Sequence, residues 1–305
     1  MHLKSLSCTN PSSVKVIPVV STKGGEGKST QTANLGGFLA DAGLKVLIID
    51  GDHAQPTASS IFPLTYEAPC GLYELLMQSA DLSVADNIIS RTDIDNLHLI
   101  ASNDPRNLLP THMLNVPDGR VRLRNALSAP LFSNYDVILI DSQGAKSVML
   151  ELIILASTGE MIGMVKPVLP DVREFLRGTV ALMEDLLPYS AFGIKLPAIR
   201  MLVNCMKYNS LAKATIGHAE TIINSKEYSE HTDDIVVSML QTRIYDLAVY
   251  EQGHASGKPV HRLENKTSRV SDSAFDSMHK LASELFPEFK ERFDAFAVSG
   301  GVNAR

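Results

Sequence analysis

The segment 23–30 carries the strongest chemical signal in the sequence. It reads Lys-Gly-Gly-Glu-Gly-Lys-Ser-Thr, and it lies between a β-branched run at 14–21 and a segment with helical spacing at 29–42. Glycines let backbone N–H groups converge on phosphate oxygens, and a helix N-terminus adds partial positive charge at the same place. A strand, a glycine-rich loop, Lys-Ser-Thr and a helix in this order predict a phosphate-binding loop.

The residue types within this loop predict separate roles. Lys28 is placed to reach the β- and γ-phosphates of a nucleotide, Ser29 to coordinate Mg²⁺, and Thr30 to contact the α-phosphate. Glu26 is an acid close to the expected phosphates, and it is tolerable there only if its side chain points away from them. The remaining residues predicted to bind the nucleotide through the loop are Lys23, Gly24, Gly25, Glu26 and Gly27.

Two further apolar runs end in an aspartate. The run at 45–50 ends in Asp50, and the run at 137–141 ends in Asp141. Ligands of open parallel α/β sheets sit at the carboxyl ends of the strands. We therefore expect Asp50 and Asp141 to join Ser29 around Mg²⁺, through water. The alternative for each acid is a charge that only solubilises the end of a strand.

Alternating strands and helices must position these residues. Runs of strand length, apolar almost throughout, are typical of strands buried on both faces of a parallel sheet. They lie at 14–21, 45–50, 97–102, 137–141, 161–165, 199–204 and 235–239, with helix-like segments at 29–42, 71–79, 121–126, 148–156 and 175–186. The pattern predicts an α/β fold, with a doubly wound, mostly parallel sheet flanked by helices. The region 57–134 is expected to form a long connection that caps one side of the sheet.

Composition and length indicate a single P-loop domain at 14–298, with flexible tails at 1–13 and 299–305. The chain has 305 residues, of which 45% are hydrophobic and 20% are charged, so wholesale disorder is excluded. The start is too polar for a signal peptide, and no apolar stretch approaches the roughly 20 residues of a membrane span. Cys8, Cys70 and Cys205 lie far apart, which argues against a zinc cluster or a disulfide framework and fits the cytosol.

A lysine directly before the two glycines gives the loop its family resemblance. The general P-loop pattern has glycine at the position of Thr22, whereas this loop resembles the deviant Walker A motif, KGGxGK[ST], of the ParA/MinD superfamily. That resemblance implies an ATPase with weak basal activity that uses ATP and Mg²⁺. It also implies an ATP-bound homodimer in which Lys23 reaches the nucleotide of the partner subunit.

Other segments resemble later motifs of the same family. The segment 46–59 is similar to a strand followed by DxDPQ, which implies that Asp52 orients the attacking water; Gln55 comes later than usual, so its role is loosened. The segment 135–142 resembles a Walker B strand, but Ser142-Gln143-Gly144 stands where Thr-Pro-Pro is usual. Asn204 matches the position that contacts adenine in relatives, although it could instead cap a strand. The segment 255–260 resembles the late motif at the start of the last long helix.

The resemblance extends to ParA-type partition ATPases. It implies that the ATP-bound dimer binds DNA non-specifically and that a ParB-like centromere-binding partner stimulates hydrolysis and releases the dimer. A cytoplasmic, nucleoid-associated location follows from this role. A nucleotide-clamped scaffold that barely hydrolyses ATP is the non-enzymatic alternative.

Net charge and local charge point in different directions. The 28 basic and 34 acidic residues give a net charge of −6, which disfavours a nucleic-acid partner. Non-specific DNA binding needs only local positive potential, however, and the stretches 186–219 and 258–269 are poor in acids. The residues predicted to contact DNA are Lys195, Arg200, Lys207, Lys213, Arg243, Arg262, Lys266 and Arg269.

Two other functions stay open. A MinD-like positioning ATPase needs a membrane-binding amphipathic helix, and 288–298 places Phe289, Phe293 and Phe296 near one face. Acidic and basic residues are mixed in this segment, whereas membrane-surface helices prefer Lys and Arg, so we expect a helix that docks on the domain and does not bind a membrane. A P-loop metabolic ligase of the dethiobiotin synthetase type is the second alternative, although no substrate motif supports it. A nitrogenase-type reductase is excluded because the paired cysteines are missing.

Overall fold

All nine strands of the computed structural model, which describes residues 14–300 except 54, 105 and 267, belong to one sheet. Their order is β3-β4-β5-β2-β6-β1-β7-β8-β9. The strands are β1 (Lys15–Val20), β2 (Val46–Asp50), β3 (Leu64–Tyr66), β4 (Ser90–Thr92), β5 (Leu97–Ile100), β6 (Val137–Asp141), β7 (Glu160–Val165), β8 (Ala198–Met206) and β9 (Val237–Tyr245). The tail predicted at 1–13 lies outside the described residues, and so do residues 301–305 of the tail predicted at 299–305.

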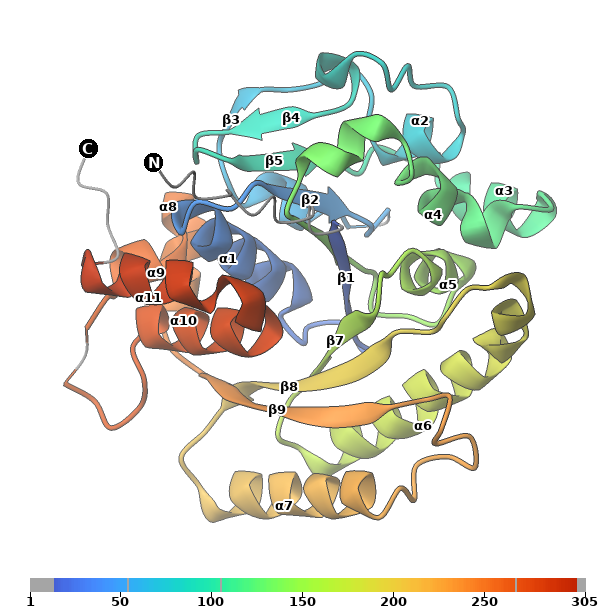
Figure 1. Ribbon diagram of the computed structural model, residues 1–305. Helices are drawn as coiled ribbons and strands as arrows, with labels where there is room; N and C mark the ends of the chain where they lie inside the picture. The colour runs from blue at the N-terminus through green and yellow to red at the C-terminus, as the bar shows by residue number, and fades with distance from the viewer. Residues whose placement is uncertain (1–13, 54, 105, 267, 301–305) are drawn as a thin grey trace, which may run out of the picture.

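Helices cover both faces of this sheet. Figure 1 shows α1 and α10 on one face, and α5, α6 and α7 on the other. The helices are α1 (Lys28–Asp41), α2 (Leu72–Leu76), α3 (Leu109–Asn115), α4 (Arg122–Ala126), α5 (Val148–Leu155), α6 (Leu169–Leu186), α7 (Ser210–Asn224), α8 (Val249–Ser256), α9 (Val260–Leu263), α10 (Ala274–Leu285) and α11 (Lys290–Val298). The predicted fold class, a mostly parallel α/β sheet flanked by helices, is confirmed.

Parallel pairing aligns the carboxyl ends of the central strands. Strand β6 pairs with β1 on one side and with β2 on the other, and Asp50 lies directly opposite Asp141. Every residue of β2 and β6 is buried, and alternate side chains enter opposite cores. Ile48, for example, faces α1, whereas Leu47 faces the core that contains α5. Burial on both faces explains why these strands read as unbroken apolar runs.

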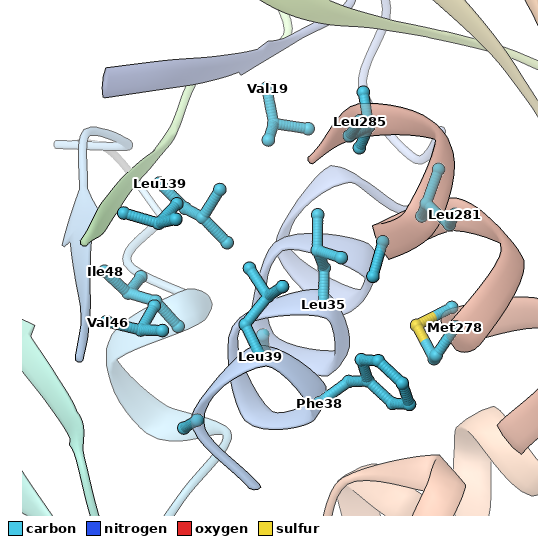
Figure 2. Packing of buried hydrophobic residues seen from close by; sticks show 14 of the residues in the cluster. Val19, Leu35, Phe38, Leu39, Val46, Ile48, Leu139, Met278, Leu281 and Leu285 are labelled. Carbon is cyan, nitrogen blue, oxygen red and sulfur yellow. The ribbon is translucent and has the colours of Figure 1, made fainter. Parts of the chain in front are cut away.

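The helix α1, which follows the phosphate-binding loop, is held in an apolar core. Figure 2 shows Leu35, Phe38 and Leu39 of this helix between sheet residues and α10. Phe38 is completely buried and meets Phe275 edge-to-face, with 5.6 Å between the ring centroids. Such packing stabilises a helix much more than its intrinsic propensity does, so the start of α1 has a fixed position.

Two sequence predictions of strand structure were incomplete. The region 57–134 contains short strands as well as helices: β4 pairs with β5 in antiparallel orientation, and β3 pairs with β4 in the same way. The strand predicted at 235–239 begins later and continues to Tyr245. Its second half contains the exposed Gln241 and the partly buried Arg243, so the apolar run stops before the strand does.

The terminal helix α11 docks on the domain through its aromatic face. Phe293 is fully buried, Phe296 is nearly so, and both pack in the core that contains α1. Pro287 lies between α10 and α11, as expected from its inability to continue a helix. Among the described residues, none of the helices combines the length and the apolar character that crossing a membrane requires.

The segment 255–260 does not begin the last long helix, so that expectation was wrong. It forms the end of α8 and the start of α9, and α10 starts later, at Ala274. The segment that follows it is pinned to α1 through Asp41. This carboxylate accepts hydrogen bonds from His261 Nε2 at 2.8 Å and from Arg262 Nε at 2.6 Å. Burial by itself raises the pKa of Asp41, but the hydrogen bonds from Arg262 and His261 outweigh it, so the pKa lies below its usual value.

Replacement of this carboxylate tests how strongly the segment is held. We expect Asp41→Asn to lower the free energy of unfolding in urea by about 2 kcal/mol at pH 7, because a charge-assisted pair is lost. A depressed pKa contributes stability above the unfolded value of about 3.9 and loses it as the pH falls through the folded pKa. The difference between the parent and the variant should therefore shrink below about pH 4.

Asp294→Asn is the matched control. Asp294, like Asp41, accepts from a histidine and a basic side chain. Its partners are His279 and Lys290, but its own side chain is 46% exposed. Its replacement should change the unfolding free energy much less. An Asp41→Asn variant as stable as the parent at neutral pH would contradict the anchoring role.

Candidate functional site

The phosphate-binding loop is shaped by Gly27, at a position where a side chain would be strained. Gly27 caps the N-terminus of α1 with a φ of 84°, which is in the left-handed region. A Cβ atom on Gly27 would lie 2.5 Å from Nδ2 of Asn204, whereas Gly24 and Gly25 face open space. The loop is therefore supported from behind by Asn204 and open in front, as a cradle for an anion requires.

Lys28 is the buried cation of the site. Its side chain is 6% exposed, and its Nζ donates to Ser21 Oγ at 3.0 Å and to the Lys23 carbonyl at 3.4 Å. Burial lowers the pKa of Lys28, while Asp141 and Asp52 act in the opposite direction. A desolvated ammonium with few protein partners has a strong tendency to bind an anion.

The two strand-end aspartates lie opposite each other, beside Lys28 and Ser29. Asp50 is fully buried, and it accepts from the amide and the hydroxyl of Ser59, both at 2.7 Å. Burial raises the pKa of Asp50 to about 6. Burial and the neighbouring Asp50 raise the pKa of Asp141 to about 7, although Ser29 and Lys28 lower it in part. Neither oxygen of the Asp141 carboxylate has a well-formed hydrogen bond within the described part of the chain.

Asp52 lies in the turn that follows β2. Its backbone N–H donates to Asp50 Oδ1 at 3.2 Å, and its own Oδ1 accepts from the Gln55 amide at 2.9 Å. Asp52 also raises the pKa of Lys28, which places its charge near the phosphate-binding loop. The backbone of Gln55 supports the turn in this state. The roles of Asp52 in catalysis and of the other site residues stay predictions.

Lys23 is held by two carboxylates from the first turns of α6. Its Nζ lies 2.7 Å from Asp171 Oδ1 and 2.7 Å from Glu174 Oε2. These hydrogen bonds raise the pKa of Lys23 above its usual value, so the ammonium stays charged. The side chain of Lys23 therefore points along its own subunit, toward α6.

Asn204 and Glu26 support the phosphate-binding loop from inside. Asn204 is 3% exposed; its Nδ2 donates to the Glu26 carbonyl at 2.7 Å, and its Oδ1 accepts from Gln31 Nε2 at 3.3 Å. The Glu26 side chain is buried, and burial raises its pKa although Lys166 opposes the shift. Because Lys166 follows β7, the Glu26 carboxyl points toward that strand end, as expected for an acid in this loop.

A pocket of about 410 Å³ opens at the carboxyl ends of β7 and β8. Cys205, directly after Asn204, lines it with a φ of 53°, and so do Pro167 and Val168. The amide of Asn204 is engaged with the loop in this structure, so the predicted contact with adenine would have to share or replace those hydrogen bonds.

The loop after β6 is packed against the phosphate-binding loop. Ser142 Oγ donates to the Val19 carbonyl at 2.8 Å. A Cβ atom on Gly144 would lie 2.4 Å from the carbonyl oxygen of Lys23. The sequence Ser142-Gln143-Gly144 therefore brings this loop closer to Lys23 than a larger residue in place of Gly144 would allow.

The eight basic residues predicted to contact DNA do not form one continuous surface. Lys195 precedes β8 and Lys207 follows it, and nine residues at about 3.3 Å each separate these lysines by about 30 Å. Lys213 and Lys266 are exposed. The four arginines are paired with acids: Arg200 with Glu160, Arg243 with Glu220, Arg262 with Asp41 and Arg269 with Glu264. The Arg243 side chain is only 14% exposed, so it presents little positive surface in this state.

Some residues of the site were missed from the sequence. Asp171 and Glu174 hold Lys23, and Ser59 holds Asp50. Two acids three residues apart, just after an apolar run, are the signal that could have found the first pair, because such residues share one face of a helix. No pattern could have indicated Ser59, since its contact depends on the fold of the 51–60 turn.

Comparison with known proteins identifies the family. The profile of the AAA domain family matches residues 14–167, about half of the chain, so the protein belongs to this family. Within it, the chain is a P-loop ATPase of the ParA/MinD superfamily. Over 127 residues, 42% of this chain, it is 32% identical to the sporulation initiation inhibitor protein Soj of Bacillus subtilis. That match spans 49% of Soj, about half the length of the relative.

Solved structures with the same fold cover nearly the whole chain. The septum site-determining protein MinD of Pyrococcus horikoshii, complexed with Mg-ADP, has a TM-score of 0.65 at 21% identity and covers 92% of this chain and 98% of its own. A plasmid partition protein of Borrelia burgdorferi bound to AMPPNP has a TM-score of 0.62 at 22% identity, over 90% of this chain and 99% of its own. At these identities the likeness establishes the fold alone.

Gly27→Ala tests the geometry of the loop. The added Cβ would force a left-handed residue, at about 1–2 kcal/mol, and would collide with Asn204. We expect the dissociation constant for ADP, measured by isothermal titration calorimetry, to rise at least about tenfold. Gly217→Ala, in α7 with open space around it, is the matched control and should bind like the parent. Unchanged affinity in Gly27→Ala would show that this loop does not bind the nucleotide.

Proposed function

We propose that this protein is a Mg²⁺-dependent ATPase that segregates DNA. The observation that carries the proposal is the pair of incompletely satisfied charges at the strand ends, the buried ammonium of Lys28 and the buried carboxylate of Asp141. An anion at the loop and a hard cation beside Asp141 would complete both, and oxygen ligands such as Ser29 and Asp141 suit Mg²⁺. When bound, Mg²⁺ would neutralise charge on the β- and γ-phosphates.

Different residues of the chain bind different parts of the nucleotide and its metal ion. Lys28 and the loop amides hold the phosphates, Ser29 and the two strand-end aspartates hold the metal shell, and Thr30 contacts the α-phosphate. Asp52 orients the attacking water. The base of ATP would occupy the pocket beside Cys205, next to Asn204.

Lys23 supports a switch between two states. In the present state Asp171 and Glu174 neutralise it within its own subunit. In an ATP-bound homodimer, Lys23 would leave these acids and stabilise charge that develops on the γ-phosphate of the partner subunit. The loss of two ion pairs opposes this movement, which agrees with a slow basal turnover.

We propose that the dimer binds DNA and that a ParB-like protein stimulates the release of the dimer from DNA. Lys195, Lys213 and Lys266 supply exposed charge, whereas the exposed Lys207 lies 3.6 Å from Asp246; a dimer doubles each of these lysines. The MinD-like alternative requires a free amphipathic helix, but the aromatic face of α11 is already buried against the domain. The burial of this aromatic face therefore favours DNA over a membrane.

Lys28→Ala tests the coupling of nucleotide to DNA. Without the buried ammonium we expect the affinity for ATP to fall by about 100-fold. In gel-shift assays on arbitrary duplex DNA with no nucleotide, with ADP or with ATP, the parent should bind in ATP only, and Lys28→Ala should not bind. Lys45→Ala removes an exposed lysine outside the site and serves as the control.

Each outcome of the shift assay has a meaning. DNA retention by Lys28→Ala equal to that of the parent would show that the nucleotide does not control DNA. Binding of the parent to anionic phospholipid vesicles instead of DNA would move the proposal to a MinD-like positioning ATPase. Binding to neither would favour the ligase.

Asp52→Asn tests the hydrolytic step. The amide keeps the oxygen that accepts from the Gln55 N–H but loses the charge. We expect phosphate release to fall by about 100-fold, while ATP-dependent dimerisation, followed by light scattering, persists. Asp81→Asn, in a comparable exposed turn at Ser83, is the control. Normal turnover in Asp52→Asn would remove this carboxylate from the mechanism.

A further inference from the structure

One face of α1 is in contact with the segment 254–262 along most of its length. The face consists of Thr30, Asn34, Gly37 and Asp41, which are spaced four, three and four residues apart. This spacing places them in one row on a helix. Asn34 Oδ1 accepts from the Val260 amide at 2.8 Å. Gly37 allows close packing, because a Cβ atom there would lie 2.7 Å from Cγ of Pro259.

The row ends at the phosphate-binding loop, and there the contact is made by His254. Its Nε2 lies 2.9 Å from Oγ1 of Thr30, in the first turn of α1. His254 belongs to α8, one turn after Tyr250, which packs against the core that contains α1. Because residues four apart share a helix face, the packing of Tyr250 orients His254 toward α1.

The contact with His254 can fix the direction in which the Thr30 hydroxyl donates its proton. A threonine hydroxyl has one proton to donate and can accept at the same time. If Nε2 of His254 carries its proton, it donates to Thr30 Oγ1, and the hydroxyl proton is left to donate to a phosphate oxygen held by the loop. With a phosphate bound, the two hydrogen bonds would form a chain that fixes the direction of the hydroxyl.

We propose that His254 is a positioning residue of the nucleotide site, which orients the Thr30 hydroxyl toward the α-phosphate of a bound nucleoside di- or triphosphate. The inference rests on the proposed function, because it requires that the loop binds a nucleotide. It assigns α8 a part in nucleotide affinity that neither the loop motif nor the strand ends indicate. Since Thr30 acts at the α-phosphate, His254 affects binding and leaves the hydrolytic step alone.

Substitution of His254 separates this role from a structural one. We expect His254→Ala to raise the dissociation constants for ADP and ATP about fivefold each, the effect of one hydrogen bond. The turnover number at saturating ATP should be unchanged, and KM should rise by the same factor. His254→Gln keeps an N–H donor and should restore the affinity to within about twofold of the parent.

A double-mutant cycle tests whether Thr30 transmits the effect. In a Thr30→Val background the hydroxyl is missing, so His254→Ala should no longer change the affinity. His218→Ala, which removes an exposed histidine of α7, is the matched control. Melting temperatures without nucleotide, equal in all variants, show that the fold is intact.

Three results would overturn the inference: unchanged affinity in His254→Ala, an equal loss in the Thr30→Val background, or a lower turnover number with KM unchanged. The proposed function fails differently. If the parent binds neither ADP nor ATP, or if Lys28→Ala binds both as the parent does, the loop is not a nucleotide site. If the parent binds and Lys28→Ala does not, while His254→Ala behaves like the parent, only the role of His254 is lost.

Discussion

Parallel pairing of β1, β6 and β2 is the constraint on which the site depends. The strands β6 and β2 end together, with Asp141 opposite Asp50, while β1 on the other side of β6 leads directly into the phosphate-binding loop. No local preference brings these three chain ends together, since about 110 residues separate the loop from Asp141. The buried faces of the strands set the register, because a shift by one residue would turn every side chain to the opposite face.

The same burial leaves charged groups of the site without full pairing, at a cost in free energy. Asp50, Asp141 and Lys28 are taken out of water by the sheet and α1, and the pKa of each carboxyl is raised as a result. Charges in such surroundings are costly unless they are paired, and residues arranged for function commonly lower the stability of the free protein. Binding of a phosphate and a cation would relieve this cost, so ligand binding and stability should rise together.

The site is connected to two other parts of the molecule. On one side, Lys23 is bound to α6 through Asp171 and Glu174, so the position of this lysine and the start of α6 are linked. On the other side, α1 is joined to α8 and α9 from Thr30 to Asp41. A change at the phosphate-binding loop therefore has a direct physical route to both faces of the sheet, through contacts that are polar and can be exchanged.

The sequence by itself determined the loop, the strands that end in Asp50 and Asp141, and the fold class, because each is encoded by neighbours in the chain: glycines before Lys-Ser-Thr, and unbroken apolar runs between helical segments. Only the tertiary structure decided the partners of the charged side chains. Lys23 contacts α6, Asn204 supports the loop and Arg243 pairs with Glu220, and none of these partners is near in sequence. Local patterns report on backbone shape and burial, whereas the pairing of side chains depends on which surfaces the fold brings together.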